Sequence, residues 1–271
     1  FVSDPVNDVF ANAISLIGSS GTSSVSNLKA TKESGEPNHA GNVGGKSVWW
    51  SFQPSVDGVL SLSTSNSTLD TILGLYTGAN VSHLNPIASN DDAYAGVPGG
   101  WSQIIQAVRA NQVYHIAVDG YDNVSGTVFL DYAFVPATVY RLTTGNTVGG
   151  TVLPASGDFA SGSTVVIAAV SDANYEFDTW NGSVVSLNNP LPVVIGSDLN
   201  ITGNFRPITF TDGFESGNLL QLAWTTAGNK PWIVQTNVVS AGQFAARSGA
   251  IINNQTSSLI LTPNVAAGDV A

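Results

Sequence analysis

The chain has 271 residues, of which only 10% are charged, and its formal net charge is −11. A surface this acidic repels phosphate backbones, which argues against nucleic acid as a partner. The sequence contains no cysteine, so a disulfide framework and a thiolate metal site are both excluded. No apolar stretch approaches the roughly twenty residues that a membrane-spanning helix needs, and we expect no membrane span.

The composition favours strands joined by tight turns. Gly, Ser, Thr, Asn and Val are abundant, a mixture typical of antiparallel β-structure. The sequence has no methionine, not even an initiator, and the simplest explanation is a mature chain whose signal peptide has been removed. We therefore expect an all-β protein that is secreted and displayed on a bacterial cell surface. We expect it to be divided into an extended segment (residues 1–6), a β-sandwich (7–136), a small β-grasp-like repeat (137–208) and an incomplete jelly roll (209–271), the last two as implied by the family resemblances of their motifs.

The first module contains six strand-like runs separated by turn residues. In Gly58–Thr64, for example, apolar and polar side chains alternate as in a half-buried strand. One short helix is expected over Asp8–Leu16, capped by Asn7 or Asp8. The other predicted strands are Ser47–Gln53, Thr71–Tyr76, Trp101–Val108, Val113–Asp119 and Gly126–Phe134.

Several motifs of the first module occur in the order found in a known family. They are NDVFANA (Asn7–Ala13), ATKESGEPNHAG followed by GGKSVWWSF (Ala30–Phe52), LDTILGLYTG (Leu69–Gly78), ASNDD (Ala88–Asp92) and YHIAVDGY (Tyr114–Tyr121). With these motifs the segment resembles the bacterial pre-peptidase C-terminal (PPC-like) domain. The resemblance implies a β-sandwich that accompanies secreted enzymes or adhesins and performs no chemistry itself. Some relatives bind calcium, and some bind polymeric substrates such as collagen.

The second module is shorter and equally rich in strand signals. A β-branched run, Gly162–Val170, precedes the aromatic motif YEFDTWNG (Tyr175–Gly182), and a closing strand follows at Ile201–Phe205. This order resembles the bacterial repeat related to internalin B-repeats, a small spacer domain. Its three aromatic residues have two interpretations, a sugar-binding platform or core packing, and packing is the commoner use of clustered aromatics. They are Tyr175, Phe177 and Trp180.

The third module begins near Thr209 and resembles the first half of a meprin-like or carbohydrate-binding jelly roll. Its pattern is FTDGFESG, then PWIV, AARSG and SSLILT. A closed jelly roll has about eight strands, whereas only four or five fit here. An open half-sheet exposes unpaired backbone groups and an apolar face, so it requires a partner or more chain.

Acidic and amide side chains at predicted turns suggest structural calcium sites. Hard divalent cations take six to eight oxygen ligands, and carboxylates clustered on turns supply them. The alternative is that these side chains make the turns through bonds to their own backbone. The candidate ligands in the first module are Asp70, Asn90, Asp91, Asp92, Asp119 and Asp122, and those in the third module are Asp212 and Glu215.

The segment KESGEPNH offers a further metal or ligand loop. Its candidate ligands are Glu33, Glu36, Asn38 and His39. The same residues also suit a rigid turn that contains proline, and we favour this structural interpretation.

Catalysis finds little support in the sequence. The three histidines are scattered, and neither HExxH nor G-x-S-x-G occurs. We therefore predict that the protein is not an enzyme. Surface glycosylation is compatible with sequons at Asn66, Asn80, Asn123, Asn181, Asn200 and Asn254.

Two functions fit this organisation. In the first, the chain is a structural or adhesive subunit that assembles head to tail into a filament. Its first segment, with Phe1, Val2, Ser3 and Val6, would add a strand to the open sheet of another copy. In the second, the modules are accessory parts of a larger secreted adhesin or hydrolase. The expected partner is thus another copy of the chain, or a surface polysaccharide or matrix polymer.

Overall fold

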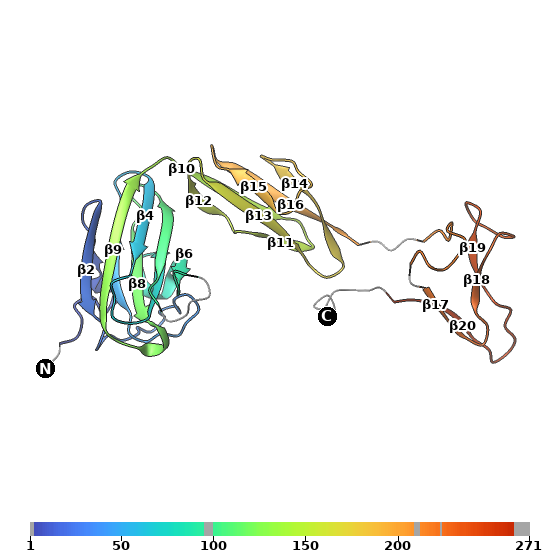
Figure 1. The fold of residues 1–271 in the computed structure, drawn as a ribbon, viewed down its shortest axis with the longest axis horizontal. Coiled ribbons are helices and arrows are strands. Elements are labelled where there is room, and N and C mark those ends of the chain that lie inside the picture. Colours follow the sequence, from blue (N-terminus) through green and yellow to red (C-terminus); the bar gives the residue numbers. More distant parts are fainter. Residues whose placement is uncertain (1–2, 95–99, 209–211, 223, 263–271) are drawn as a thin grey trace. The chain divides into compact units, whose positions relative to one another are not determined.

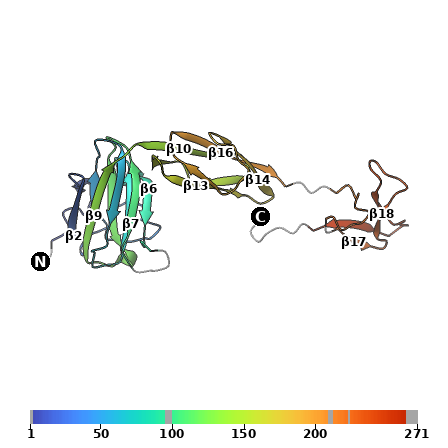
Figure 2. The ribbon, with the colours of Figure 1, turned by 45° about the horizontal axis from the view of Figure 1, so that its top comes forward.

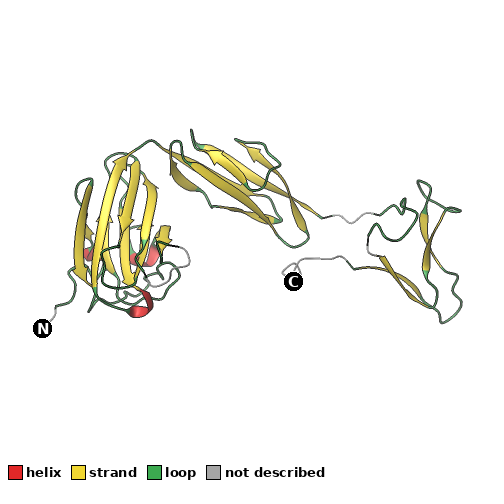
Figure 3. Ribbon diagram, viewed as in Figure 1, coloured by secondary structure: helices red, strands yellow, loops and turns green. Residues whose placement is uncertain are grey.

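The computed structural model describes residues 3–94, 100–208, 212–222 and 224–262. Strands form almost all of the regular structure of these ranges (Figures 1 and 3). Their helices are the three-residue 3-10 turns η1 (Phe10–Asn12), η2 (Val81–His83) and η3 (Tyr121–Asn123), and none could cross a membrane. The prediction of an all-β protein is confirmed.

The first module is a sandwich of two sheets. Sheet A has the strand order β1-β3-β8-β5-β6, and sheet B has the order β2-β9-β4-β7. Strands β2 and β9 run side by side over seven residue pairs (Figure 2). The strands of sheet A are β1 (Ile14–Ser15), β3 (Val48–Phe52), β8 (Tyr114–Gly120), β5 (Thr71–Thr77) and β6 (Asn85–Asn90). Those of sheet B are β2 (Ser20–Ser26), β9 (Thr127–Pro136), β4 (Gly58–Ser63) and β7 (Gln103–Val108).

All six predicted strands of this module form, but the predicted helix over Asp8–Leu16 is wrong. Only η1 is helical there, and β1 follows directly. Two tertiary hydrogen bonds compete with the helix: the N–H of Phe10 donates to Glu33 at 2.5 Å, and the Asp8 carboxylate accepts from the N–H of Thr31 at 2.6 Å. Asp8 is thus used to fix a neighbouring loop and not to cap a helix.

The inner faces of sheets A and B enclose the main apolar core. Trp50 of β3 and Leu60 of β4 are completely buried, and burial of a large side chain contributes about 1.5–3 kcal/mol. The indole N–H of Trp50 donates to the hydroxyl of Ser23 at 2.8 Å, so its polar atom is satisfied. Further core residues are Val48, Leu62, Leu73, Leu75, Ile116, Val118, Val128 and Leu130.

Sheet A is also covered on its outer face. There Trp49, Tyr76 and Ala117 are buried against a layer that includes Phe10 and Val81. A loop, which we call the covering segment (residues 27–46), lies on this face through the ring contacts of His39 with Trp49 and Tyr76. Sheet B, in contrast, buries only one face: β4 alternates between buried and half-buried residues.

The second module has two sheets of its own, with strand orders β12-β10-β16-β14 and β11-β13-β15. Trp180 is completely buried, packs 5.1 Å from the ring of Phe177 and donates its indole N–H to the carbonyl of Asn188 at 2.9 Å. Core packing, and not a sugar platform, is therefore the role of Trp180. The strands are β10 (Val139–Asn146), β11 (Gly150–Leu153), β12 (Gly157–Ala160), β13 (Thr164–Ser171), β14 (Tyr175–Gly182), β15 (Leu191–Val194) and β16 (Leu199–Pro207).

The described strands of the third module form two separate pairs. Among the described strands, β17 (Trp224–Gly228) pairs only with β20 (Ser257–Leu261), and β18 (Trp232–Gln235) pairs only with β19 (Ala245–Ser248). Not one described residue from 212 to 262 falls in the buried class. The described part of this module therefore consists of two-stranded ribbons without a core.

Candidate functional site

Three of the predicted calcium ligands lie together at one end of sheet A. Asp70 directly precedes β5, and Asp91 and Asp92 directly follow β6. Because β5 and β6 are antiparallel neighbours, with Leu73 opposite Asn90, the start of one strand meets the end of the other. We call Asp70, Asp91 and Asp92 the acidic cluster.

The buried hydroxyl group of Ser102 fixes this end of the sheet. The hydroxyl of Ser102 donates to the carbonyl oxygens of Thr71 at 2.5 Å and Asp91 at 2.7 Å. Asn90, the fourth predicted ligand here, makes the turn instead. Its amide N–H donates to the Asp92 carbonyl at 3.0 Å, and its side-chain oxygen accepts from the N–H of Gln103 at 2.8 Å.

Each carboxylate of the acidic cluster has one oxygen that lacks a partner. One oxygen (Oδ1) of each is buried without a hydrogen bond. Burial, followed by the charge of Asp92, raises the pKa of Asp70, although the N–H of Gly100 opposes this shift. Burial also raises the pKa of Asp91, with the charges of Asp92 and Asp70 as further causes. Oxygen ligands of this kind suit a hard cation. Among the described residues, however, no three acidic, His or Cys side chains are already arranged to hold a metal ion.

Asp119 and Asp122 have other surroundings. Asp119 is completely buried, and its carboxylate accepts from the N–H groups of Gly45 at 2.7 Å, Lys46 at 2.8 Å and Gly120 at 2.7 Å. It thereby ties the covering segment to β8. Asp122 is exposed in η3 and has a left-handed φ of 50°, as turn-forming Asp residues do.

In the third module, Asp212 and Glu215 hold loops together. Asp212 accepts from the N–H of Phe214 at 2.7 Å and from the indole N–H of Trp224 at 2.8 Å. Glu215 accepts from the N–H groups of Gln243 at 2.9 Å and Phe244 at 3.2 Å. Every carboxylate oxygen of this pair therefore already has a donor.

The KESGEPNH loop forms a buried polar network with Tyr76 of β5. His39 lies between Glu36 and Tyr76, at 2.9 Å from Glu36 Oε1 and 2.6 Å from the Tyr76 hydroxyl. The second oxygen of Glu36 accepts from the N–H of Glu33 at 2.8 Å, while Asn38 accepts from Lys32 at 2.7 Å. His39 and Glu36 are 1% and 8% exposed, so a ligand in solvent cannot reach them. The structural interpretation of this loop is supported.

Tyr76 makes this network sensitive to alkali. Burial, followed by the charge of Glu36, raises the pKa of Tyr76 from 10.0 to about 12. The folded state therefore keeps the phenol neutral where the unfolded state ionises it. The contribution of Tyr76 to the free energy of unfolding is therefore fully present below pH 10. It falls by about 3 kcal/mol in total as the pH rises from 10 to about 12.

We expect Tyr76→Phe to flatten this alkaline decline. Urea unfolding midpoints at pH 9, 10 and 11 measure it, with Tyr121→Phe, an exposed tyrosine, as the matched control. Equal slopes for wild type and Tyr76→Phe would contradict the assignment.

The remaining predicted residues are accessible where the structure describes them. Val6 is 73% exposed and Ser3 is exposed, whereas Phe1 and Val2 lie outside the described residues. All six sequon asparagines are exposed, namely Asn66, Asn80, Asn123, Asn181, Asn200 and Asn254.

One set of surface residues was missed by the sequence predictions. The pairing registers align Thr22, Asp131, Ser63 and Gln103 across the outer face of sheet B. The polar positions of β4 and β9 signal such a face. However, the complete row can be predicted only if β2, which contributes Thr22, is recognised as a strand.

Comparison with known proteins finds a family match in the second module. Residues 140–209 match the family model of the divergent InlB B-repeat domain, which confirms the internalin-type prediction for this part of the chain. No curated protein matches the chain. A solved structure, the pre-peptidase C-terminal domain of collagenase from Bacillus anthracis, is 16% identical with a TM-score of 0.30, over 44% of this chain and 93% of that one. So low a TM-score supports no conclusion about this protein.

Proposed function

We propose that the protein is a non-catalytic, extracellular structural or adhesive protein of a bacterial surface, whose third module is completed by a strand from another copy. The tandem β-modules and the InlB-type repeat support a role in display and attachment. The observation that carries the proposal is the lack of any buried residue among the described residues of the third module.

The described strands of that module lack what a stable β-domain needs. Isolated two-stranded ribbons are marginal in water, and three or more strands with a covered apolar face are required. Here Leu220, Val238 and Ile252 are 83%, 75% and 75% exposed. Among the described strands, both ribbons also have unpaired edges, which are templates for an added strand.

The donor that we propose is the segment Phe1–Val6 of a second copy. Asn7, which follows it, is completely buried. It is fixed to Trp49 by two hydrogen bonds, from the Asn7 amide at 2.8 Å and from the Trp49 N–H at 2.9 Å. The proposed donor segment is thus joined directly to a residue that is fixed to β3. Donor-strand addition gains main-chain hydrogen bonds, and a head-to-tail contact that does not close produces a filament.

Deletion of residues 1–6 tests this assembly. We expect the wild-type chain to form concentration-dependent filaments in electron micrographs and sedimentation experiments, and the deletion variant to stay monomeric. Addition of the peptide FVSDPV, but not of its scrambled version, should slow amide exchange in β17 and β20 of the variant. Monomeric wild-type protein with slowly exchanging β17 and β20 amides at every concentration would contradict self-assembly.

We also propose that the acidic cluster holds a structural calcium ion. The three buried carboxylate oxygens without partners support this proposal, because like charges in one place repel unless a cation neutralises them. The carboxylates would have to draw closer together to coordinate the ion.

The raised pKa values of Asp70 and Asp91 determine whether pH and mutation raise or lower the stability of the first module. Since Asp70 and Asp91 have raised pKa values in the folded state, stability without calcium should fall as the pH rises above 3.8. Asp92→Asn should therefore raise the melting temperature in EGTA and abolish the increase that calcium gives the wild type. Asp172→Asn, an exposed position in the second module, is the control. An identical wild-type melting temperature in calcium and in EGTA would count against the site.

A further inference from the structure

The outer face of sheet B differs from that of sheet A in being open. Along β9, Val128 and Leu130 point into the core, so the alternate residues Phe129, Asp131 and Ala133 point outward. These three are half-buried or exposed. The covering segment and η1 lie on sheet A, and the polar side chains of sheet B face solvent.

A row of hydrogen-bonding side chains crosses this open face. Thr22 of β2 lies opposite Asp131 of β9, which lies opposite Ser63 of β4, which lies opposite Gln103 of β7. Neighbouring strands are about 4.8 Å apart, so the row is about 14 Å long. It is long enough to contact several units of an extended chain.

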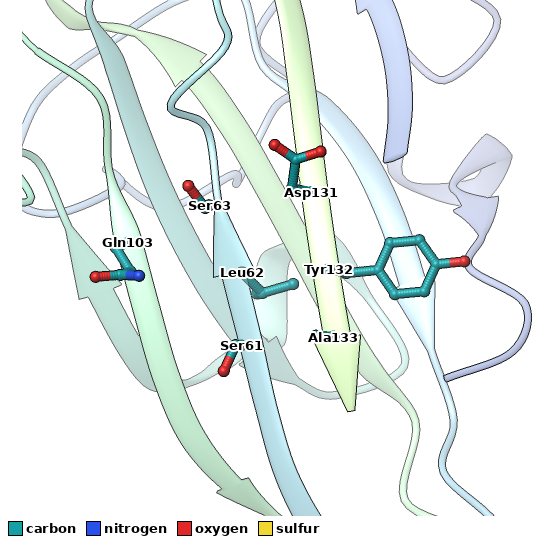
Figure 4. Close-up of a pocket in the computed structure, with 7 residues that line it drawn as sticks. All are labelled: Ser61, Leu62, Ser63, Gln103, Asp131, Tyr132 and Ala133. Carbon is teal, nitrogen blue, oxygen red and sulfur yellow. The ribbon is translucent and has the colours of Figure 1, made fainter. Parts of the chain in front are cut away.

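The neighbouring row, in which Ser61 of β4 lies opposite Ala133 of β9, forms a hollow on this face. Ser61 and Ala133 are small, and with Ser63, Gln103 and Asp131 they line a depression of about 160 Å³. Figure 4 shows Gln103 and Asp131 on either side of Ser63. Pockets for small molecules are typically about 300–1,000 Å³ and enclose their ligand. This shallow, open hollow suits one unit of a polymer that lies across the sheet.

The polar side chains around the hollow can form further hydrogen bonds. The Asp131 carboxylate accepts from the Thr22 hydroxyl and from the Asn66 amide, the latter at 2.9 Å. A carboxylate has about four acceptor sites, so two remain for a ligand. Within the described ranges, the Gln103 side chain has no hydrogen-bond partner, and it offers both a donor and an acceptor.

Apolar groups flank these polar ones on the same face. Phe129 lies two residues from Asp131 on β9 and is half-buried. Ile105, opposite Ser61 on β7, is 65% exposed. A sugar ring presents hydroxyl groups at its rim and an apolar C–H face, so it matches this mixture of carboxylate, amide and apolar side chains.

We infer that the outer face of sheet B binds a neutral, hydroxyl-rich polysaccharide along the row from Thr22 to Gln103. This inference rests on the proposed extracellular role and names a ligand class for it. The Asp131 charge and the net charge of −11 disfavour polyanions. An extended peptide would add to a strand edge and not lie across a sheet face.

Affinity electrophoresis tests the inference with polymers of stated composition. Native gels contain hydroxyethylcellulose, dextran, xyloglucan or galactomannan, with alginate as the polyanionic control. We expect retardation by at least one neutral polymer and none by alginate. Gln103→Ala should weaken the binding about fivefold, the value of one lost hydrogen bond, and Ser61→Trp should abolish it by filling the hollow. Gln112→Ala, at an exposed position between β7 and β8, should bind like the wild type.

Two results would overturn the inference. One is the absence of retardation by all four neutral polymers, and the other is unchanged retardation in both Gln103→Ala and Ser61→Trp. Unchanged melting temperatures establish that these variants are folded. The gels are also run with the chain lacking residues 1–6, so that failed filament assembly and failed polysaccharide binding remain distinguishable.

Discussion

Replacement of Asp119 by alanine should lower the free energy of unfolding of the first module by about 3–6 kcal/mol. The Asp119 carboxylate is completely buried and accepts three backbone hydrogen bonds, from Gly45, Lys46 and Gly120. Each buried N–H that loses its acceptor costs about 1–3 kcal/mol, and the half-buried Gly45 and Lys46 lie at the low end of this range. Amide exchange in β3 and β8, measured on the full chain under native conditions, reports this loss for the first module alone.

Two further variants sharpen the test. Gly44→Ala should also destabilise the module. The added Cβ would lie 1.9 Å from an Asp119 carboxylate oxygen, and the φ of +54° at Gly44 disfavours any side chain. Asp122→Asn, at an exposed position three residues from Asp119, should change stability by less than about 0.5 kcal/mol. The loss in Asp119→Ala should be equal in calcium and in EGTA. A loss that disappears in EGTA would show that Asp119 is a metal ligand and not a brace for the covering segment.

Replacement of His39 by alanine should cost about 3–5 kcal/mol. The variant leaves the Glu36 carboxylate and the Tyr76 hydroxyl buried without the partner that now joins them. Removal of one member of a buried polar pair is costly for this reason, and the missing ring adds a cavity beside Trp49. Urea unfolding followed by amide exchange in β3 and β5 measures the change.

Matched variants separate the hydrogen bonds from the packing. Tyr76→Phe removes only the hydroxyl and should cost about 1–2 kcal/mol. His83→Ala removes an exposed histidine whose ring nitrogen contacts only the Ser82 hydroxyl among the described hydrogen bonds, and it should be nearly neutral. If His39→Ala were as stable as His83→Ala, the buried network would have no structural importance.

The strands with clear alternation could be predicted from the sequence, and those without it could not. Gly58–Ser63 buries every second residue as its pattern indicates. In contrast, β2 (SGTSSVS) has one large apolar residue, Val25, and is a strand because all seven of its residues pair with β9. The short strand β6 contains Pro86, which a strand tolerates at the edge of a sheet.

The candidate sites depend on contacts between distant parts of the chain, and this limits their prediction. The position of acidic residues at predicted turns suggested both Asp119 and Asp92 as calcium ligands. Two of the three donors to Asp119 come from residues 73 and 74 positions earlier, a pairing that no local pattern reveals. Likewise, the row on sheet B requires the register of four strands, one of which had not been predicted.

The covering segment has a consequence for the rate at which the protein folds. Its hydrogen bonds join residues that are 74 positions apart at Gly45 and Asp119 and 99 positions apart at Asn27 and Gly126. Such contacts form only after sheet A has brought distant strands together, and domains dominated by non-local pairing fold in milliseconds to seconds. We therefore expect the covering segment to become ordered in the last kinetic phase of refolding. Once it has closed over Trp49, its loss should be the first and slowest step by which the sandwich opens.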